Sequence, residues 1–175
     1  MVDLRDTLAD HQSGFETLLA KIPGYRGYKE KELRREADQK LREHLAGQLA
    51  QQLSQAEEVA SQMLTGPGLS QLNEIGKGNT RLQTLIDKVK TAAQGYAGFF
   101  DAVKFKENEL DQLYEFDETM VSQVTEIGAA IEAIQAALDS GEDSQLGPAA
   151  RNYVKAVTDA SATFDRRKDT ILGLV

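Results

Sequence analysis

The chain has 175 residues, of which 41% are hydrophobic and 6% aromatic, with a formal net charge of −8 and no cysteine. A chain of this length forms one domain with a buried core, and the lack of cysteine excludes disulfides, thiolate metal ligands and a cysteine nucleophile. No apolar run reaches the roughly 18 residues of a membrane span, and the acidic N-terminus lacks the apolar segment of a secretory signal. We therefore predict a single cytoplasmic domain over residues 1–175.

Residues 3–22 are predicted to form a first amphipathic helix. Its largely apolar stripe has helical spacing and consists of Leu4, Leu8, His11, Phe15, Leu18 and Ile22. Gly14 weakens this helix, and Ser13 followed by Glu16 has the pattern of a capping box. We therefore expect a break near residue 13, with residues 1–12 loosely ordered.

A turn and a long second helix follow. The sequence Pro23-Gly24-Tyr25-Arg26-Gly27-Tyr28 ends the first helix, because proline cannot continue it and glycine permits positive φ. A helix from about Lys29 to Leu64 is then predicted from a stripe of leucine and alanine, and its polar face is rich in glutamine beyond Gln48. Gly66-Pro67-Gly68 is the clearest helix stop in the chain.

The segment after this stop is predicted to be irregular. A short helical piece at Leu69–Ile75 is followed by Gly76-Lys77-Gly78-Asn79-Thr80, which is expected to interrupt it. Asn79 or Thr80 is a suitable cap for a third helix that begins at Arg81.

From Leu82 to Leu138 the apolar residues recur at alternating steps of three and four, as in helices that face partner helices. One continuous helix of this length is rare in a compact domain. We therefore favour a break between residues 100 and 108, with Asp101 or Asn108 as the cap of the next helix. Phe105 is suited to act as a hydrophobic staple before Asn108. An unbroken helix is the alternative.

Eleven acidic residues and no lysine or arginine lie between Glu107 and Asp143. This acidic face is expected either to lie against the basic helices of the chain or to be solvated. Asp117 is the exception, because it occupies an apolar position of the helix between Leu113 and Met120. We predict that it sets the register of the helix or pairs with a neighbouring lysine or arginine.

A polar loop at Asp139–Ser144 is predicted to lead into the last helix, with Pro148 in its first turn. The apolar stripe of that helix is Tyr153, Val157, Ala160, Phe164, Ile171 and Leu174. Arg166-Arg167-Lys168 place positive charge near its C-terminus, where the helix dipole favours cations. With no strand-like alternation in the chain, the fold class is predicted to be all-α: an antiparallel bundle of four to five helices with coiled-coil-like packing, or an elongated rod.

The sequence contains no recognisable catalytic motif. Neither His11 nor His44 has a glutamate three residues before it, so the Glu-x-x-His pattern of di-iron bundles is absent. Lys77 is followed by glycine and not by the serine or threonine of a phosphate-binding loop. We predict no catalytic residue, no cofactor and no metal site, and hence a protein that is not an enzyme.

The segment from Ile22 to Arg42 has the most unusual local composition. It combines two tyrosines with several lysines and arginines, and acidic residues are interspersed among them. We predict a protein-docking surface on Tyr25, Arg26, Tyr28, Arg34 and Arg35. Nucleic acid is not expected as a partner, because phosphate binding favours fewer acidic residues.

The same segment carries a resemblance. The turn Ile22-Pro23-Gly24-Tyr25 with Gly27-Tyr28, followed by Lys29, Lys31, Glu32, Arg34 and Arg35, resembles an uncharacterised bacterial family of all-helical proteins. The resemblance covers about 25 residues. It implies a bacterial source and no known activity, so it assigns no functional residue.

The function expected from the sequence is that of a non-enzymatic helical scaffold or protein–protein interaction module. Its protein partner is unknown, and self-association into a homo-oligomer along residues 82–138 is one expectation. The alternative is a peripheral membrane protein whose first helix lies on the bilayer and whose basic turn meets the headgroups. Asp3, Asp6, Asp10 and Glu16 in that helix disfavour a membrane surface.

Overall fold

The structure, a computed structural model, describes residues 14–92 and 106–173. A helix over residues 14–21 comes first. The elements that follow are η1 (Lys31–Leu33), α2 (Arg34–Met63), η2 (Pro67–Gln71), α3 (Leu72–Thr91), α6 (Glu107–Ser140) and α7 (Asp143–Gly173). No strand occurs in these two ranges, and the predicted all-α helical bundle is confirmed. The expected loose order of residues 1–12, Ser13 as a cap and His11 lie outside the described residues.

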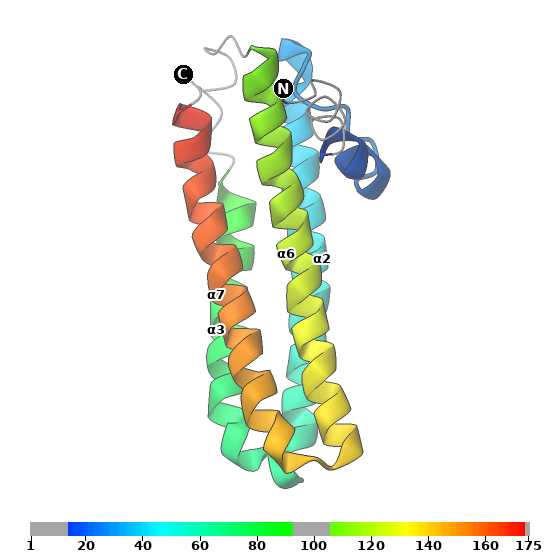
Figure 1. The fold of residues 1–175 in the computed structure, drawn as a ribbon, viewed down its shortest axis with the longest axis vertical. Helices are drawn as coiled ribbons and strands as arrows, with labels where there is room; N and C mark the ends of the chain where they lie inside the picture. Colours follow the sequence, from blue (N-terminus) through cyan, green and yellow to red (C-terminus); the bar gives the residue numbers. More distant parts are fainter. Residues whose placement is uncertain (1–13, 93–105, 174–175) are drawn as a thin grey trace, which may run out of the picture.

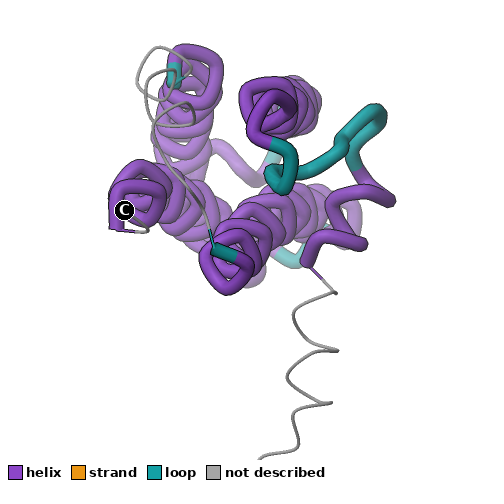
Figure 2. Tube along the Cα trace, turned by 90° about the horizontal axis from the view of Figure 1, so that it is seen from above, coloured by secondary structure: helices purple, strands orange, loops and turns teal. Residues whose placement is uncertain are grey.

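The four long helices form an elongated bundle in which consecutive helices run in opposite directions (Figure 1). Around the bundle, α2 and α7 each lie between α3 and α6 (Figure 2). The neighbours α2 and α6 are parallel, because Gln52 bonds to Val124 and Gln62, ten residues further on, bonds to Gln135. Helices α3 and α6 lie diagonally opposite each other in the bundle.

The core lies along the axis of the bundle and consists mainly of leucine, isoleucine, valine and alanine. Members of the predicted stripes that are buried include Leu41, Leu45, Leu49, Leu82, Leu85, Val89, Leu113, Met120, Ile127, Ile131, Ile134, Tyr153, Val157 and Phe164. Burial of these side chains is the main stabilising contribution in a bundle of this kind.

The apolar series from Leu82 to Leu138 belongs to two helices, so the unbroken helix is excluded. Helix α3 ends at Thr91, and α6 begins at Glu107 after Lys106, whose backbone is extended. The Glu109 carboxylate caps α6 by accepting a 2.7 Å hydrogen bond from the Lys106 backbone N–H. Asn108 is thus the second residue of α6 and not its cap, whereas Asp101 and Phe105 lie outside the described residues.

The prediction of an interrupted segment before Arg81 is wrong. Helix α3 begins at Leu72 and continues through Gly76 and Gly78 to Thr91 without a break. Gly78 is needed for packing: a Cβ there would lie 2.3 Å from Cε1 of Tyr153 on α7. The close contact between α3 and α7 provides the stabilisation that local propensity lacks.

The connection between α6 and α7 is shorter than the predicted loop. Helix α6 ends at Ser140, Gly141 takes a left-handed conformation with φ of 69°, and α7 begins at Asp143. Pro148 is the sixth residue of α7 and not part of its first turn. Residues 174–175, and therefore Leu174, lie outside the described residues.

Candidate functional site

The segment from residue 14 to residue 33, called the N-terminal arm below, lies against the side of the bundle formed by α2 and α6 (Figures 1 and 2). Its short helix and turn insert apolar and aromatic side chains into the core: Leu18, Ile22, Tyr25 and Tyr28. Gly27 has φ of 81°, and a Cβ there would lie 2.6 Å from the Phe15 ring. The predicted turn therefore exists, and its glycine is required both by backbone conformation and by space.

The five residues of the predicted docking patch do not form one exposed surface. Tyr25, Tyr28 and Arg34 are buried, with exposed fractions of 4%, 0% and 5%. Arg26 and Arg35 are exposed. The patch was predicted from tyrosines beside basic residues, but the tyrosines pack against α6, so the docking role of the three buried residues is corrected.

A network of charged side chains lies inside the bundle, between the arm, α2, α6 and α7. Arg167 of α7 is fully buried and donates from Nε to Asp117 Oδ1 at 2.9 Å and from Nη1 to Asp38 Oδ1 at 2.6 Å. Arg42, one turn beyond Asp38 on α2, donates to the other oxygen of Asp38 at 2.8 Å. This charge network thus alternates arginine and aspartate across three helices.

The arm is attached to the charge network through Tyr28. Its hydroxyl donates to Asp117 Oδ2 at 2.6 Å and accepts a bond from Arg167 Nη2 at 3.1 Å. Its backbone N–H donates to the Tyr114 hydroxyl at 2.7 Å, and its carbonyl accepts from Arg34 Nε at 2.8 Å. The backbone and side chain of one residue therefore both hold the turn to the bundle.

Burial controls the electrostatics of this network. It raises the pKa of the Tyr28 hydroxyl well above its ordinary value, and the charge of Asp117 adds to that shift. For Arg167, burial alone lowers the pKa, but Asp117, Tyr28 and Asp38 outweigh burial and keep the guanidinium charged. A charged arginine thus lies between two aspartates, with a tyrosine donor, and Asp117 and Arg167 have no exposed surface, whereas Arg42 at the edge of the network is 8% exposed. The arrangement therefore fastens helices together.

The prediction that Asp117 pairs with a basic residue is confirmed, with Arg167 as its partner. From the sequence, Arg167 is expected only to place positive charge near the end of the last helix, and neither Asp38 nor Arg42 is singled out. The only sequence signal for Asp38 and Arg42 is that each directly follows an apolar residue of the predicted stripe, Ala37 and Leu41 respectively. The remaining acidic residues of the stretch from Glu107 to Asp143 do not share this burial in the described part of the chain.

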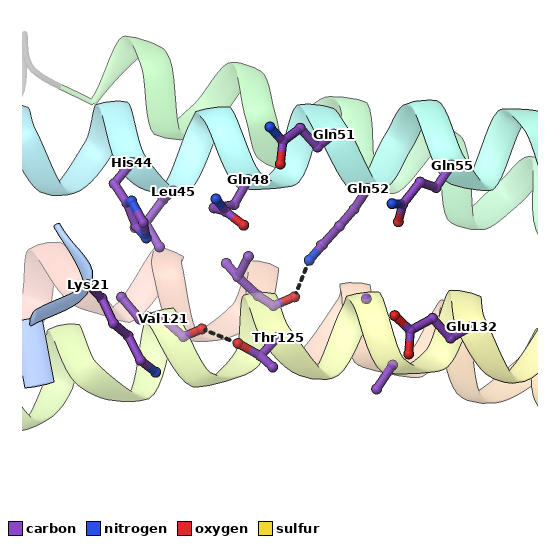
Figure 3. A pocket seen from close by; sticks show the side chains of 13 residues that line it. Lys21, His44, Leu45, Gln48, Gln51, Gln52, Gln55, Val121, Thr125 and Glu132 are labelled. Carbon is purple, nitrogen blue, oxygen red and sulfur yellow. Dashed lines mark hydrogen bonds between the residues drawn. The ribbon is translucent and has the colours of Figure 1, made fainter. Parts of the chain in front are cut away.

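The surface has a polar groove of about 450 Å³ between α2 and α6, below the arm (Figure 3). Helix α2 contributes His44 and a row of glutamines at helical spacing: Gln48, Gln51, Gln52 and Gln55. Helix α6 contributes small residues, among them Thr125, Gly128 and Ala129. Long amides facing small side chains produce the hollow, which we call the glutamine groove.

Hydrogen-bonding groups line the floor and ends of the glutamine groove. Gln52 donates from Nε2 to the Val124 carbonyl at 2.6 Å, and its own Oε1 is buried without a hydrogen-bond partner among the described residues. Lys21 of the arm lies at one end and Glu132 of α6 at the other (Figure 3). Burial lowers the pKa of His44, and the nearby Lys21 lowers it further.

The sequence signal for this groove was the glutamine-rich polar face of α2. Periodicity placed these amides on one face, but it could not show that α6 opposes them with small residues. Among the described residues, no group of three or more histidine and acidic side chains is placed to hold a metal ion. The described helices include none that is long and apolar enough to cross a membrane.

Fold and surface together define an all-helical bundle with a buried charge network and a polar groove beside its N-terminal arm. Comparison of the chain with protein-family models, with curated proteins and with solved structures gave no match.

Proposed function

We propose that the protein is a non-enzymatic helical interaction module, and that it binds a protein partner in the glutamine groove. The observation that carries this proposal is the contrast between the interior and the surface. The charged groups that could do acid–base chemistry, above all Asp117 and Arg167, bond to one another out of reach of solvent. The groove, in contrast, presents amides that can still donate and accept hydrogen bonds.

The composition of the groove favours a protein over a small charged ligand. Three exposed glutamines, Gln48, Gln51 and Gln55, offer neutral donors and acceptors along about two turns of helix, which suits the polar groups of another polypeptide. The charges of the groove, Lys21 and Glu132, have opposite sign. A patch of this kind does not concentrate an anion such as phosphate, because it has no cluster of positive charge.

The membrane-surface alternative receives less support. The described part of the first helix buries Leu18 and Ile22 against the bundle, and Tyr25 and Tyr28 of the basic turn are buried as well. These apolar groups are not available to enter a bilayer while the arm is attached. Salt-sensitive co-sedimentation of the full chain with anionic vesicles would favour this alternative over the groove.

Site-specific photo-crosslinking tests the proposal. The exposed Gln51 is replaced by benzoylphenylalanine, and the same replacement at Gln83, an exposed glutamine of α3 outside the groove, serves as the matched control. Irradiation of cells of the source organism should yield discrete protein adducts from position 51 only. No adduct from position 51, or the same adducts from both positions, would contradict the proposal.

Two further properties stay predictions. A bacterial source is implied by the resemblance of the turn at Ile22–Tyr28. A cytoplasmic location is favoured by the absence of cysteine from the sequence, since thiols are not then available to form disulfides.

A further inference from the structure

We infer that the glutamine groove binds a second copy of this chain, arranged antiparallel about a twofold axis through the middle of the groove. The inference rests on the proposed function and names its partner. In such a dimer, Lys21 of each copy faces the partner's Glu132.

The neutral amides make the glutamine groove compatible with an identical copy of itself. A twofold interface brings a surface against an identical surface, so a patch of one charge repels itself. Glutamine amides avoid this repulsion, because each carries two donor hydrogens and an acceptor oxygen. The exposed amides of the groove are Gln48, Gln51 and Gln55, and all three are neutral.

The two charged side chains of the groove are placed so that a twofold rotation pairs them. Lys21 and Glu132 lie at opposite ends of the groove, with the glutamines between them (Figure 3). Neither has an ion-pair partner in the described part of the chain. A rotation of 180° about the centre of the groove exchanges its ends. It therefore places Lys21 of each copy against Glu132 of the other copy, so that the dimer contains two such pairs. Within one copy their separation prevents this pairing.

A neighbouring hollow provides a comparison. The depression between α6 and α7 also contains a lysine and acidic residues, but there Lys155 already pairs with Asp159 of its own helix. Its lysine is already paired within its own helix and requires no second molecule. The glutamine groove differs because its charges are split between its ends.

Sedimentation equilibrium of the full chain with charge-reversed variants tests this inference. Lys21→Glu and Glu132→Lys each convert both intermolecular attractions into repulsions, so the dimer dissociation constant should rise about tenfold or more in either variant. An equimolar mixture of the two variants should recover the wild-type affinity, because every contact in the mixed dimer pairs opposite charges. Lys90→Glu, the same charge reversal at an exposed lysine of α3, is the control and should dimerise like the wild type.

Three results would overturn the inference: a wild-type chain that stays monomeric up to about 1 mM, single variants that dimerise as tightly as the wild type, or a mixture that shows no recovery. Failure of the proposed function is distinguishable from these results. A monomeric chain whose position 51 crosslinks to a different protein overturns the second copy as partner and leaves the groove as a binding site.

Discussion

Arg167 and Asp117 form a 2.9 Å ion pair although neither side chain is exposed, and 50 residues separate them in sequence. The pair joins α7 to α6, and Asp38 joins it to α2 through the same guanidinium. A buried ion pair adds little net stability compared with apolar residues of the same shape, but removal of one member leaves a buried charge without a partner. Because of this asymmetry, we expect substitution of a single member of the charge network to be especially destabilising for the bundle.

Replacement of Arg167 by methionine should therefore destabilise the protein strongly. Asp117 and Asp38 lose their shared partner, and the expected loss is about 3–5 kcal/mol in the free energy of unfolding. Urea unfolding followed by circular dichroism measures this loss. Arg166→Met, at the exposed neighbour, is the matched control and should change stability by less than about 0.5 kcal/mol. Equal midpoints for the two variants would show that the charge network is not required.

A double variant separates lost pairing from lost shape. Arg167→Met with Asp117→Leu removes the stranded carboxylate and leaves Asp38 paired with Arg42. Because replacement of a whole buried ion pair by apolar residues is often neutral, the double variant should regain part of the stability that Arg167→Met loses. The recovery is incomplete because the Tyr28 hydroxyl loses its bonds to both residues. Unfolding at the same urea concentration as the single variant would instead indicate that packing, and not charge, causes the loss.

The hydroxyl of Tyr28 should contribute about 1–3 kcal/mol to the free energy of unfolding, because Tyr28→Phe removes one hydrogen bond each from Asp117 Oδ2 and Arg167 Nη2 in the buried interior. Tyr25→Phe is the control at an adjacent buried ring, since the Tyr25 hydroxyl has no hydrogen-bond partner in the described residues. Its stability should be unchanged or slightly higher. Thermal unfolding of both variants measures the difference, and similar losses for the two would contradict the role assigned to Tyr28.

Stability should fall at alkaline pH. Burial raises the pKa of Tyr25, Tyr28, Tyr114 and Tyr153 above the ordinary value. Above pH ~10 the unfolded chain loses these phenolic protons while the folded chain keeps them, so deprotonation favours the unfolded state. The stabilising contribution of these tyrosines is fully present below the unfolded pKa and is lost as the pH rises from there through the higher folded pKa. Urea midpoints measured from pH 8 to pH 11.5 should therefore decline above about pH 10, and tyrosinate absorbance should appear together with unfolding.

Gly76 and Gly78, two residues apart on α3, should respond in opposite ways to alanine. At Gly78 a Cβ would lie 2.3 Å from Tyr153, so α3 and α7 must separate and a loss of about 1–3 kcal/mol is expected. At Gly76 nothing lies within 4 Å of the added Cβ, and alanine should stabilise the helix by about 0.5–1 kcal/mol. Thermal denaturation distinguishes them, and a harmless Gly78→Ala would show that the helices have room.

The sequence by itself determined the helical class, the helix stop at Gly66-Pro67-Gly68, the turn at Pro23–Tyr28 and the internal position of Asp117. These features depend on periodicity and on local backbone preferences, which can be read residue by residue. Contacts between distant segments overrode local preference elsewhere. Gly76 and Gly78 lie inside α3 because Tyr153 packs against that helix, although their propensity alone predicted an interruption.

Only the tertiary structure decided which polar residues are inside. Tyr25, Tyr28 and Arg34 have the composition of a docking surface, but they are buried because α6 supplies a hydroxyl, a carboxylate and apolar neighbours at that place. Likewise, the glutamines of α2 form a groove only because small residues of α6 face them. Periodicity assigns a residue to a face of its own helix, but the partner of that face depends on which helices meet across the bundle, and no local pattern encodes that.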